Sequence, residues 1–553
     1  MQQLTRDLNR LRSENFDLLV IGGGIVGACI LRDAARRGLR CALIEKSDYC
    51  TGTSAASSRL IHGGLRYLKS LELRMVNQSL KERAIWQRIA PRHVSPIPFL
   101  FPTSKNVMSR LFYRLGLGLY DMLSFGQTMR DHNGNALPFH WALNNNDSRA
   151  AVPALMGSRF RGAYVYFDGL NLAPERIILE ILIDAQDHGA ISANYVKAMG
   201  YQFDDDTISG ARGEDSLTQE TLAIRATHVV NATGAWTNQM LDLAAVRDKK
   251  MNITLSKGIH ILTRPFTGDY ALTLADDKKH LFCIPWKSMT LIGTTDTIFE
   301  GDPDSLKVNE KEVETMLDRV NNLLPDVNLS IKDVFHAYAG LRSLASAGDD
   351  SYRMSRKAMI FDHCKHSRIR GLYSIIGGKW TTARLVAQNV IDLIVHKGGY
   401  RLRNCDTMTT ELPFEHRGNR SEEALMHMSL CQNYPKASHA IVNHLIGCYG
   451  TKAEKILNRG SRDYELLKPI CPDKTVIGAE VLHAVEEESA LQLADVVCRR
   501  TFLGTSGHPG NEALLQTASI MASKLGWSDD QKIEQITKTQ NAFPTFLDKK
   551  TEC

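Results

Sequence analysis

Residues 16–45 read FDLLVIGGGIVGACILRDAARRGLRCALIE and carry a complete dinucleotide-binding βαβ pattern. Residues 16–21 are an apolar, β-branched run typical of a buried parallel strand, and residues 25–37 have helical spacing. A second apolar run, 39–44, closes at Glu45. The stretch therefore predicts a strand, a glycine loop, a helix that ends at the following glycine, and a second strand.

Three glycines form the G-x-G-x-x-G loop, and each has its own physical role. Gly22 permits the tight turn, Gly24 lets the backbone approach a pyrophosphate, and Gly27 lets helix and strand pack closely. The helix N-terminus offers unpaired N–H groups and a partial positive charge to the phosphates. Glu45 is well situated to accept hydrogen bonds from a ribose. A glycine-rich turn without a ligand is the alternative, and the flanking strands and the acidic residue argue against it.

Length and composition indicate a folded protein of more than one domain. The chain has 553 residues, of which 43% are hydrophobic and 23% charged, and its net charge is +6. Two or three domains are expected because the chain is too long for one simple core. The mild positive charge suits an anionic small substrate or an anionic membrane surface. Because no basic tract carries interleaved aromatic residues, nucleic-acid binding is not expected.

The cysteines and the N-terminal segment bear on the cellular compartment. The 11 cysteines are scattered singly, with no C-x-x-C pair. This argues against an iron–sulfur or zinc module and against a disulfide framework, so we expect no metal site and a reduced, cytoplasmic setting. Residues 1–15 are polar and lack the apolar core of a secretory signal, and no transmembrane helix is expected.

Two further segments are suited to contact a bound cofactor. Residues 51–68, TGTSAASSRLIHGGLRYL, offer small hydroxyl groups to a pyrophosphate, and the glycines of their HGG turn allow the backbone to lie against a flat ring. Residues 225–236, RATHVVNATGAW, predict a strand ending in small residues that pass beneath the cofactor. A serine-rich surface loop is the alternative for 51–68, and its position directly after the dinucleotide unit argues against it.

The remaining patterns divide the chain into regions. Residues 257–264 and 282–296 predict strands of a separate antiparallel sheet, because aromatic and β-branched runs are broken there by turns. Residues 371–394 predict a strand, a Gly-Gly-Lys turn and a long helix that return the chain to the nucleotide-binding core. From Leu412 onward the pattern is mainly helical and predicts a separate C-terminal domain.

Residues 105–126, KNVMSRLFYRLGLGLYDMLSFG, form an amphipathic pattern in which basic residues alternate with Leu, Phe and Tyr. A helix of this kind can dock at a membrane interface. A helix that faces its own core shows the same stripe and is the more frequent case. The sequence leaves both interpretations open.

Eight blocks in one order resemble the FAD-dependent glycerol-3-phosphate dehydrogenases. They are GGGIVGACILRDAARRGL, SSRLIHGGLRYL, NATGAW, KGIH, IGTTD, YAGLR, GGKWTT and LADVVCRRT. The resemblance implies an α/β fold with an FAD-binding Rossmann-like domain of the glutathione-reductase/D-amino-acid-oxidase type, a substrate domain on an antiparallel sheet, and a C-terminal α-helical domain. The segments expected for these three domains are, in turn, 15–75, 175–240 and 335–400; 76–174 and 241–334; and 405–553.

The resemblance also implies an activity. The family oxidises sn-glycerol 3-phosphate to dihydroxyacetone phosphate by hydride transfer to FAD, and its membrane-associated members pass the electrons to a quinone. We therefore expect a single-chain flavoprotein in peripheral contact with the cytoplasmic face of the inner membrane, with glycerol 3-phosphate and a quinone as partners and a homodimer as one assembly. The alternatives are a glycerol-3-phosphate oxidase that uses oxygen, an amine or amino-acid oxidase of the same fold, and a non-catalytic flavin-binding protein.

The same resemblance indicates the candidate site residues. Arg342 and Lys379 resemble the family's substrate-pocket cations, Arg66 and Tyr67 are the next candidates, and His260 and Thr295 complete the predicted substrate set. A catalytic set of His62, Arg342 and Lys379 is expected, with His62 as the base because imidazole titrates near neutral pH. Arg342 or His260 are its rivals. The predicted FAD contacts are Gly22, Gly24, Gly27, Glu45, Thr53, Ser54, Ser58, His62, Gly63, Gly64, Leu65, Val196, Ala232, Thr233, Gly234, Gly378, Lys379, Trp380 and Thr381.

Overall fold

The computed structural model describes residues 3–104, 106–131, 134–244, 253–275, 280–345, 358–415, 420–472 and 474–550. Lys105 of the predicted amphipathic stretch, and parts of the segments predicted for the domains, lie outside these ranges.

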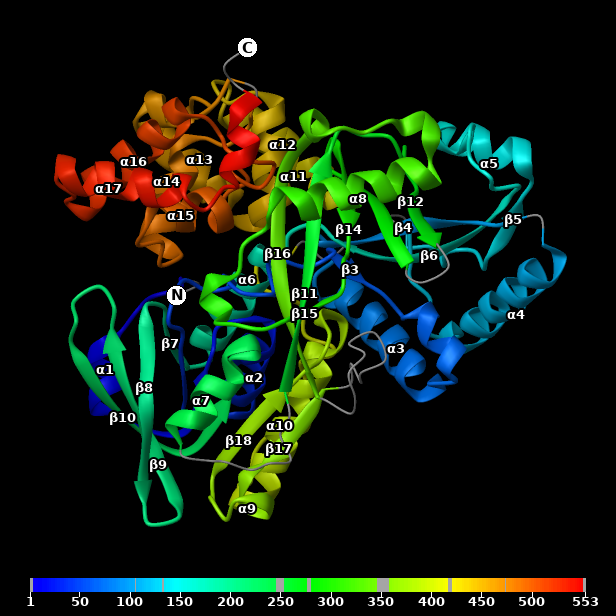
Figure 1. Cartoon of the computed structure of the whole chain (residues 1–553). Coiled ribbons are helices and arrows are strands. Elements are labelled where there is room, and N and C mark those ends of the chain that lie inside the picture. Colours follow the sequence, from blue (N-terminus) through cyan, green and yellow to red (C-terminus); the bar gives the residue numbers. More distant parts are fainter. Residues whose placement is uncertain are drawn as a thin grey trace.

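A mainly parallel sheet holds the N-terminal βαβ unit (Figure 1). Its order is β17-β18-β10-β1-β2-β7; all neighbours are parallel except the edge strand β17, and the β8–β9 hairpin extends β10. The strands are β1 (Asn15–Ile21), β2 (Cys41–Ile44), β7 (Ile191–Ala193), β8 (Val196–Asp204), β9 (Thr207–Asp215), β10 (Thr221–Asn231), β17 (Met359–Asp362) and β18 (Leu372–Ile376). The apolar core against this sheet includes residues of α2 (Ile25–Arg37), α6 (Pro174–Asp187) and α10 (Ala383–Gly398).

The βαβ unit forms as its sequence predicts. Helix α2 begins directly after Gly24 and ends at Gly38, whose φ of 104° is the left-handed conformation that glycine adopts without strain. The helix is buried along most of its length, which explains its many alanines. Strand β2 begins at Cys41 rather than at residue 39, because the backbone N–H of Leu39 donates to Ala34 O and closes the end of the helix.

A second, mainly antiparallel sheet confirms the strands predicted at 257–264 and 282–296. Its strands are β3 (Leu60–Ile61), β4 (Val94–Pro102), β5 (Trp141–Leu143), β6 (Ala163–Asn171), β11 (Ile253–Thr263), β12 (Ala271–Ala275), β13 (His280–Trp286), β14 (Met289–Gly293), β15 (Thr297–Phe299) and β16 (Val334–Ala345). Both β3 and β16 lie in this sheet, although the segments predicted for the FAD-binding domain include them. β16 does so because it pairs with β11 over nearly its whole length. The domain limits stay a prediction.

Helices surround the two sheets and make up the C-terminal part of the chain (Figure 1). Besides α2, α6 and α10, the α-helices described before residue 400 are α1 (Leu8–Ser13), α3 (Leu73–Ile89), α4 (Val107–Ser124), α5 (Asn145–Ala151), α7 (Thr237–Leu243), α8 (Glu310–Leu323) and α9 (His363–His366). The expected C-terminal helical domain is confirmed and contains α11 (Arg420–Asn433), α12 (His439–Tyr449), α13 (Ala453–Arg462), α14 (Gly478–Glu487), α15 (Leu493–Asp495), α16 (Asn511–Leu525) and α17 (Asp529–Gln540).

Buried ion pairs attach this helical domain to the dinucleotide-binding unit. Asp48, just after β2, accepts hydrogen bonds from Arg500 at 2.7 and 2.8 Å and from Arg499 at 2.6 Å. Burial acts to raise the pKa of Asp48, but the two guanidinium groups outweigh it and hold that pKa below its usual range. Arg176 of α6 forms a second buried pair with Glu488. The LADVVCRRT block thus supports the segment that follows the nucleotide-binding strands.

Candidate active site

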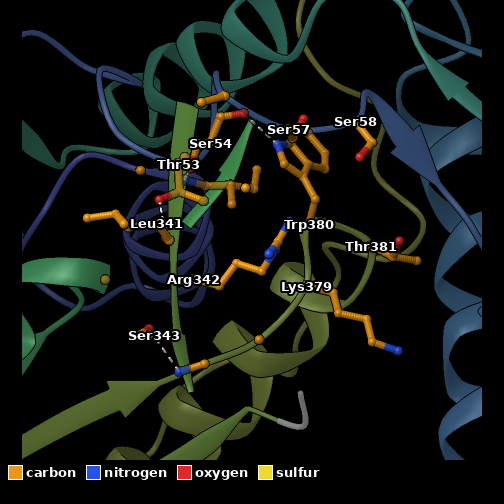
Figure 2. A pocket seen from close by; sticks show the side chains of 18 of the residues that line it. Thr53, Ser54, Ser57, Ser58, Leu341, Arg342, Ser343, Lys379, Trp380 and Thr381 are labelled. Carbon is orange, nitrogen blue, oxygen red and sulfur yellow. Dashed lines mark hydrogen bonds between the residues drawn. The ribbon is translucent and has the colours of Figure 1, made fainter. Parts of the chain in front are cut away.

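A cavity of about 1120 Å³ is lined by residues of both sheets. One end lies at the carboxyl ends of β1, β2 and β10, where Ile21, Ile44 and Ala232 line it. Ligands of open α/β sheets bind at this edge. The cavity continues past β16 and the segment after β18 toward α4. Figure 2 shows a close view with several of its lining residues.

The glycine loop comes into close contact with its surroundings. Gly22 has a φ of 114°, and a Cβ atom there would lie 2.7 Å from Ala232 O. A Cβ atom on Gly27 would lie 1.9 Å from Gly22 O, so α2 approaches β1 only because this residue has no side chain. At the start of α2, the N–H of Ile25 donates to Ser54 Oγ at 3.0 Å. The roles predicted for the loop glycines in the turn and in helix packing match this geometry.

Glu45 faces the same end of the cavity. Its carboxylate accepts hydrogen bonds from Gly23 N at 2.6 Å and from Ser47 N at 3.0 Å. Burial raises the pKa of Glu45, although these two hydrogen bonds act in the opposite direction. The carboxylate is thereby held next to the glycine loop, where a ribose is expected.

The serine-rich segment 51–58 is ordered by strand β16. Thr53 Oγ1 donates to Leu341 O at 2.5 Å, a contact drawn in Figure 2, and Tyr338 Oη donates to Ser57 O at 2.9 Å. These bonds join residues far apart in the sequence and fix the segment along the cavity wall. A free surface loop is therefore not what this segment forms.

The HGG turn is held by a buried polar network. The backbone N–H of Gly63 donates to Asp168 Oδ1 at 3.1 Å, and Asp168 also accepts from Arg83 at 2.7 Å and from Tyr120 Oη at 2.9 Å. A Cβ atom on Gly63 would lie 2.2 Å from Tyr120 Oη. Gly63 therefore packs against this network and does not line the cavity. Sequence reasoning missed the three supporting side chains because they are distant from the turn and from one another.

The segment after β18 joins the HGG turn from another part of the chain. The N–H of His62 donates to Thr381 Oγ1 at 3.2 Å, and the indole N–H of Trp86 donates to Thr381 O at 2.9 Å. The indole N–H of Trp380 donates to Ser54 O at 3.3 Å, as drawn in Figure 2. The predicted return of residues 371–394 to the nucleotide-binding core is confirmed by these contacts and by the pairing of β18 with β10.

Arg342 extends from β16 into the cavity (Figure 2). Its guanidinium group donates to Thr294 Oγ1 at 2.7 Å, to Thr295 O at 3.2 Å and to Ser256 Oγ at 3.2 Å. Asp296 Oδ1 lies 3.8 Å from one terminal nitrogen atom of that group. Because Thr295 Oγ1 accepts from Ile259 N instead, Thr294 lines the cavity and Thr295 does not.

Lys379 lies in a second cationic group with Arg66. Lys379 Nζ lies 3.8 Å from the centre of the Tyr67 ring and 3.1 Å from Met75 Sδ, and Arg66 donates to Tyr67 Oη at 2.9 Å. Figure 2 shows Lys379 pointing away from Arg342. The structure thus places the predicted cations in one cavity but in two groups, one at β16 and one around Tyr67.

The two candidate bases have different surroundings. His260 is buried, and its ring stacks on that of Tyr338. Its Nε2 atom forms a hydrogen bond with Ser58 Oγ at 2.7 Å. Burial lowers its pKa to about 3, and the positive charge of Arg342 acts in the same direction. His62 is half-buried and lines the cavity at the HGG turn.

Most of the predicted site residues line this one cavity. Those that do are Gly22, Gly24, Glu45, Thr53, Ser54, Ser58, His62, Gly64, Leu65, Arg66, Tyr67, Val196, Ala232, Thr233, Gly234, His260, Arg342, Gly378, Lys379, Trp380 and Thr381. Gly27, Gly63 and Thr295 pack behind it. Their assignment to cofactor and substrate stays a prediction.

Comparison with known proteins identifies the family. Residues 17–393 match the model of the FAD dependent oxidoreductases, and residues 405–532 match that of the C-terminal domain of alpha-glycerophosphate oxidase. A glycerol-3-phosphate dehydrogenase of Synechocystis is 32% identical over 98% of this chain and 99% of its own length. The mitochondrial glycerol-3-phosphate dehydrogenase of Bos taurus is 31% identical over 95% of this chain and 72% of its own length.

The chain belongs to the FAD-dependent glycerol-3-phosphate dehydrogenase family. Among solved structures, the glycerol-3-phosphate dehydrogenase of Bacillus halodurans in complex with FAD superposes with a TM-score of 0.77 at 26% identity, covering 97% of this chain and 95% of that one. Glycine oxidase of Geobacillus kaustophilus, at 20% identity and a TM-score of 0.52, covers 73% of this chain and all of its own, and shares the fold alone.

FAD is the cofactor of this family, and the cavity of this dehydrogenase fits it. The cavity exceeds the range of about 300–1,000 Å³ that holds most small ligands, as an extended dinucleotide requires. Gly24, which precedes α2, lines the cavity and makes no side-chain cap, so the N-terminus of the helix lies at the site where a pyrophosphate would bind, with the N–H of Ile25 bonded to Ser54 Oγ. The residues that would hold the cofactor are the glycine loop, Glu45, the hydroxyl groups of 51–58 and the turn after β18.

Substitution of Gly27 by alanine tests this fit. In Gly27→Ala the new Cβ atom meets Gly22 O, so the loop must shift and FAD affinity should fall by at least about tenfold, or ~1.4 kcal/mol. Flavin absorbance per purified chain measures the loss. Gly447→Ala in α12 is the matched control, because nothing lies within 4 Å of its new Cβ atom. Equal flavin content in both variants would contradict the account.

Proposed function

We propose that this protein oxidises sn-glycerol 3-phosphate to dihydroxyacetone phosphate and passes the electrons to a quinone. The observation that carries the proposal is the presence of Arg342, Lys379 and Arg66 in the cavity that begins at the glycine loop. A phosphorylated alcohol needs such cations because its phosphate carries nearly two negative charges. The names of the relatives and of the C-terminal family model agree with this substrate.

Arg342 is assigned to the phosphate of the substrate. Its guanidinium group donates hydrogen bonds to Thr294, Thr295 and Ser256, which orient it before substrate binds. This orientation lowers the entropic cost of ordering the side chain when the substrate binds. Lys379 and Arg66 add positive charge on the other side, around Tyr67. Two groups of cations suit a ligand whose phosphate and whose developing alkoxide both need stabilisation.

We assign His62 as the base that removes the proton of the reacting hydroxyl group. FAD, when bound, accepts the hydride from the carbinol carbon. His260, whose pKa is lowered to about 3, is too weak a base for this step at neutral pH. His62 lies in the HGG turn, which Asp168 and Thr381 hold by backbone hydrogen bonds. His260 then positions the serine-rich segment through Ser58.

The quinone proposal rests on α4. Helix α4 contributes Phe112, Leu115 and Leu119 to the wall of the cavity, so an apolar acceptor would meet an apolar lining there. The same helix exposes a row of apolar residues to solvent, namely Val107, Met108, Leu111, Phe112, Leu115 and Met122. The buried residues of α4 are Leu117, Tyr120 and Ser124. A helix that packs on its own core therefore explains the buried side of α4 but not the exposed apolar row.

We infer that this exposed face of α4 rests on the cytoplasmic surface of the inner membrane. A large exposed apolar patch marks an interaction surface. No helix in the described part of the chain is long and apolar enough to cross a bilayer. Peripheral contact at α4 would bring the apolar side of the cavity next to the lipid phase in which a quinone dissolves. A homodimer is compatible with this orientation.

The alternatives differ in acceptor or substrate. An oxygen-using oxidase is the nearest one, since the C-terminal model is named after alpha-glycerophosphate oxidase. The exposed apolar face of α4 favours the quinone over oxygen. An amine or amino-acid oxidase is disfavoured because the relatives that match nearly the whole chain are named glycerol-3-phosphate dehydrogenases. A non-catalytic flavin protein does not account for the three cavity cations.

Replacement of Arg342 tests the substrate assignment. Arg342→Ala should lower kcat/KM for glycerol 3-phosphate by at least about 30-fold, because losing one partner of a buried charge pair costs about 2–5 kcal/mol. Its flavin content should match that of the wild type. Arg264→Ala, which removes a half-exposed ion pair with Asp333, is the control and should leave turnover unchanged. Normal kcat/KM in Arg342→Ala would remove this residue from the pocket.

Replacement of the two histidines tests the choice of base. His62→Asn should slow anaerobic flavin reduction by about 10²–10⁴-fold at saturating glycerol 3-phosphate, since a positioned general base contributes that much. His260→Asn keeps a hydrogen-bonding side chain beside Ser58 and should have a smaller effect. Stopped-flow absorbance measures both rates. A larger loss in the His260 variant would reverse the assignment.

Membrane docking is tested by removing the exposed apolar side chains of α4. A variant with Leu111, Phe112 and Leu115 replaced by Ser should bind anionic lipid vesicles at least about 100-fold more weakly, since each side chain contributes about 1.5–3 kcal/mol when it leaves water. Co-sedimentation measures binding. The control replaces Leu425, Leu515 and Ile533, which are equally exposed on other helices. Equal binding of both variants would exclude α4 as the docking face.

A further inference from the structure

A cluster of three metal-ligating side chains lies in the C-terminal helical domain, apart from the cavity. His427 and Cys431 stand one turn apart on α11, and His439 begins α12. Cys431 Sγ is 3.6 Å from His427 Nε2 and 3.4 Å from His439 Nδ1. One ligand atom from each residue falls within 4.8 Å of the other two. None of the three side chains lines the cavity described above.

The two sulfur–nitrogen distances match two edges of a tetrahedral zinc site. With Zn–S of about 2.3 Å and Zn–N of about 2.05 Å, a tetrahedral angle separates the sulfur and nitrogen atoms by about 3.6 Å. Both observed sulfur–nitrogen distances lie within about 0.2 Å of that value.

We propose that His427, Cys431 and His439 bind a zinc ion that joins α11 to α12. Two imidazoles and a thiolate are ligands typical of Zn²⁺, which is a borderline-soft cation without a preferred geometry. Zn²⁺ replaces the thiol proton of Cys431, which is released to solvent. Among the described residues three side chains supply ligands, which leaves one position of the tetrahedron to water or to another group.

The local fold prepares the site. The loop between the two helices is tightened by a hydrogen bond from Ala437 N to Tyr434 O, and Ser438 caps α12 through Ile441 N. His439 is thereby fixed at the first turn of α12. All three side chains are half-buried or exposed, which leaves a path for the ion.

Helix α11 has little else to hold it. Leu430 is its fully buried apolar side chain, Met426 and Cys431 are only partly buried, and Leu425 and Met428 face solvent. A metal ion bound between α11 and α12 would therefore add an attachment where apolar packing is thin. We infer a structural role for the ion, separate from the oxidation reaction.

Two other clusters lack this geometry. His93, Glu180 and Glu415 form a buried group, but Arg92 already donates to Glu180 at 2.6 Å and neutralises it. His444 contacts Cys448 through Nδ1 and Glu480 through Nε2, so its two partners lie on opposite sides of the ring. The His444–Cys448 pair has the same helical spacing as His427–Cys431 and serves as a matched control.

The experiment measures zinc on the flavin-loaded full chain after dialysis against a chelator. Wild-type protein should take up one Zn²⁺ per chain, by metal analysis after gel filtration, and Co²⁺ should give the absorption of a tetrahedral thiolate complex. Cys431→Ser and His439→Gln should bind Zn²⁺ more than about 100-fold more weakly. Loss of an outer-sphere partner lowers metal affinity by about 10–100-fold, so a larger loss identifies a direct ligand. Cys431→Ser should also lose the thiolate–cobalt band.

Controls separate this site from others. Cys448→Ser and the exposed Cys364→Ser should keep wild-type zinc affinity and the cobalt band. All variants should keep flavin and turnover, which shows that they are folded. In hydrogen exchange, zinc should slow the amides of α11 in the wild type and in the two control variants, but not in Cys431→Ser or His439→Gln. Absence of stoichiometric zinc binding, unchanged affinity in Cys431→Ser, or unchanged exchange in α11 would overturn the proposal.

Discussion

The close contact between α2 and β1 at Gly27 sets the geometry on which the rest of the site depends. A Cβ atom at this position would lie 1.9 Å from Gly22 O, so the first turn of α2 can reach the end of the parallel sheet only with glycine there. That approach places the start of the helix at the cavity, where a pyrophosphate would bind. The other residues predicted to contact the cofactor line the cavity that begins at this end of the sheet or pack directly behind it.

Hydrogen bonds between distant segments extend this end into a complete site. Thr53 bonds to Leu341 of β16, His62 to Thr381 after β18, and Gly63 to Asp168 of β6. Each bond joins a side chain to the backbone: Thr53 uses its hydroxyl group, whereas His62 and Gly63 use their backbone N–H groups. The helical domain supports the same region through the buried pairs of Asp48 with Arg499 and Arg500. The cavity is therefore built and supported by segments from most of the chain.

Local patterns predicted the fold well because their causes are local. Gly22 and Gly27, the apolar runs around them and the turn after β18 act through nearby backbone, and the structure agrees with each. Register across the sheet was harder, since Thr294 rather than its neighbour Thr295 faces the cavity. That difference depends on pairing with β11, which no single segment encodes.

Other features depend on tertiary contacts and were not predictable from the sequence. Arg83, Asp168 and Tyr120 support the HGG turn from three separate elements. Which side of α4 is exposed depends on which of its residues pack against the rest of the protein, and this packing is a tertiary contact. The histidine–cysteine cluster of α11 and α12 has no C-x-x-C pair, so the cysteine spacing argued against a metal there.

Anaerobic titration of the purified protein tests the central claim, that distant segments of this chain build one flavin site for a phosphorylated alcohol. The purified protein should be yellow, and its flavin absorbance should be lost when glycerol 3-phosphate is added. Addition of glycine or D-alanine should leave that absorbance unchanged. A colourless protein that releases no adenine nucleotide on denaturation, or a bound flavin that stays oxidised with glycerol 3-phosphate, would contradict it.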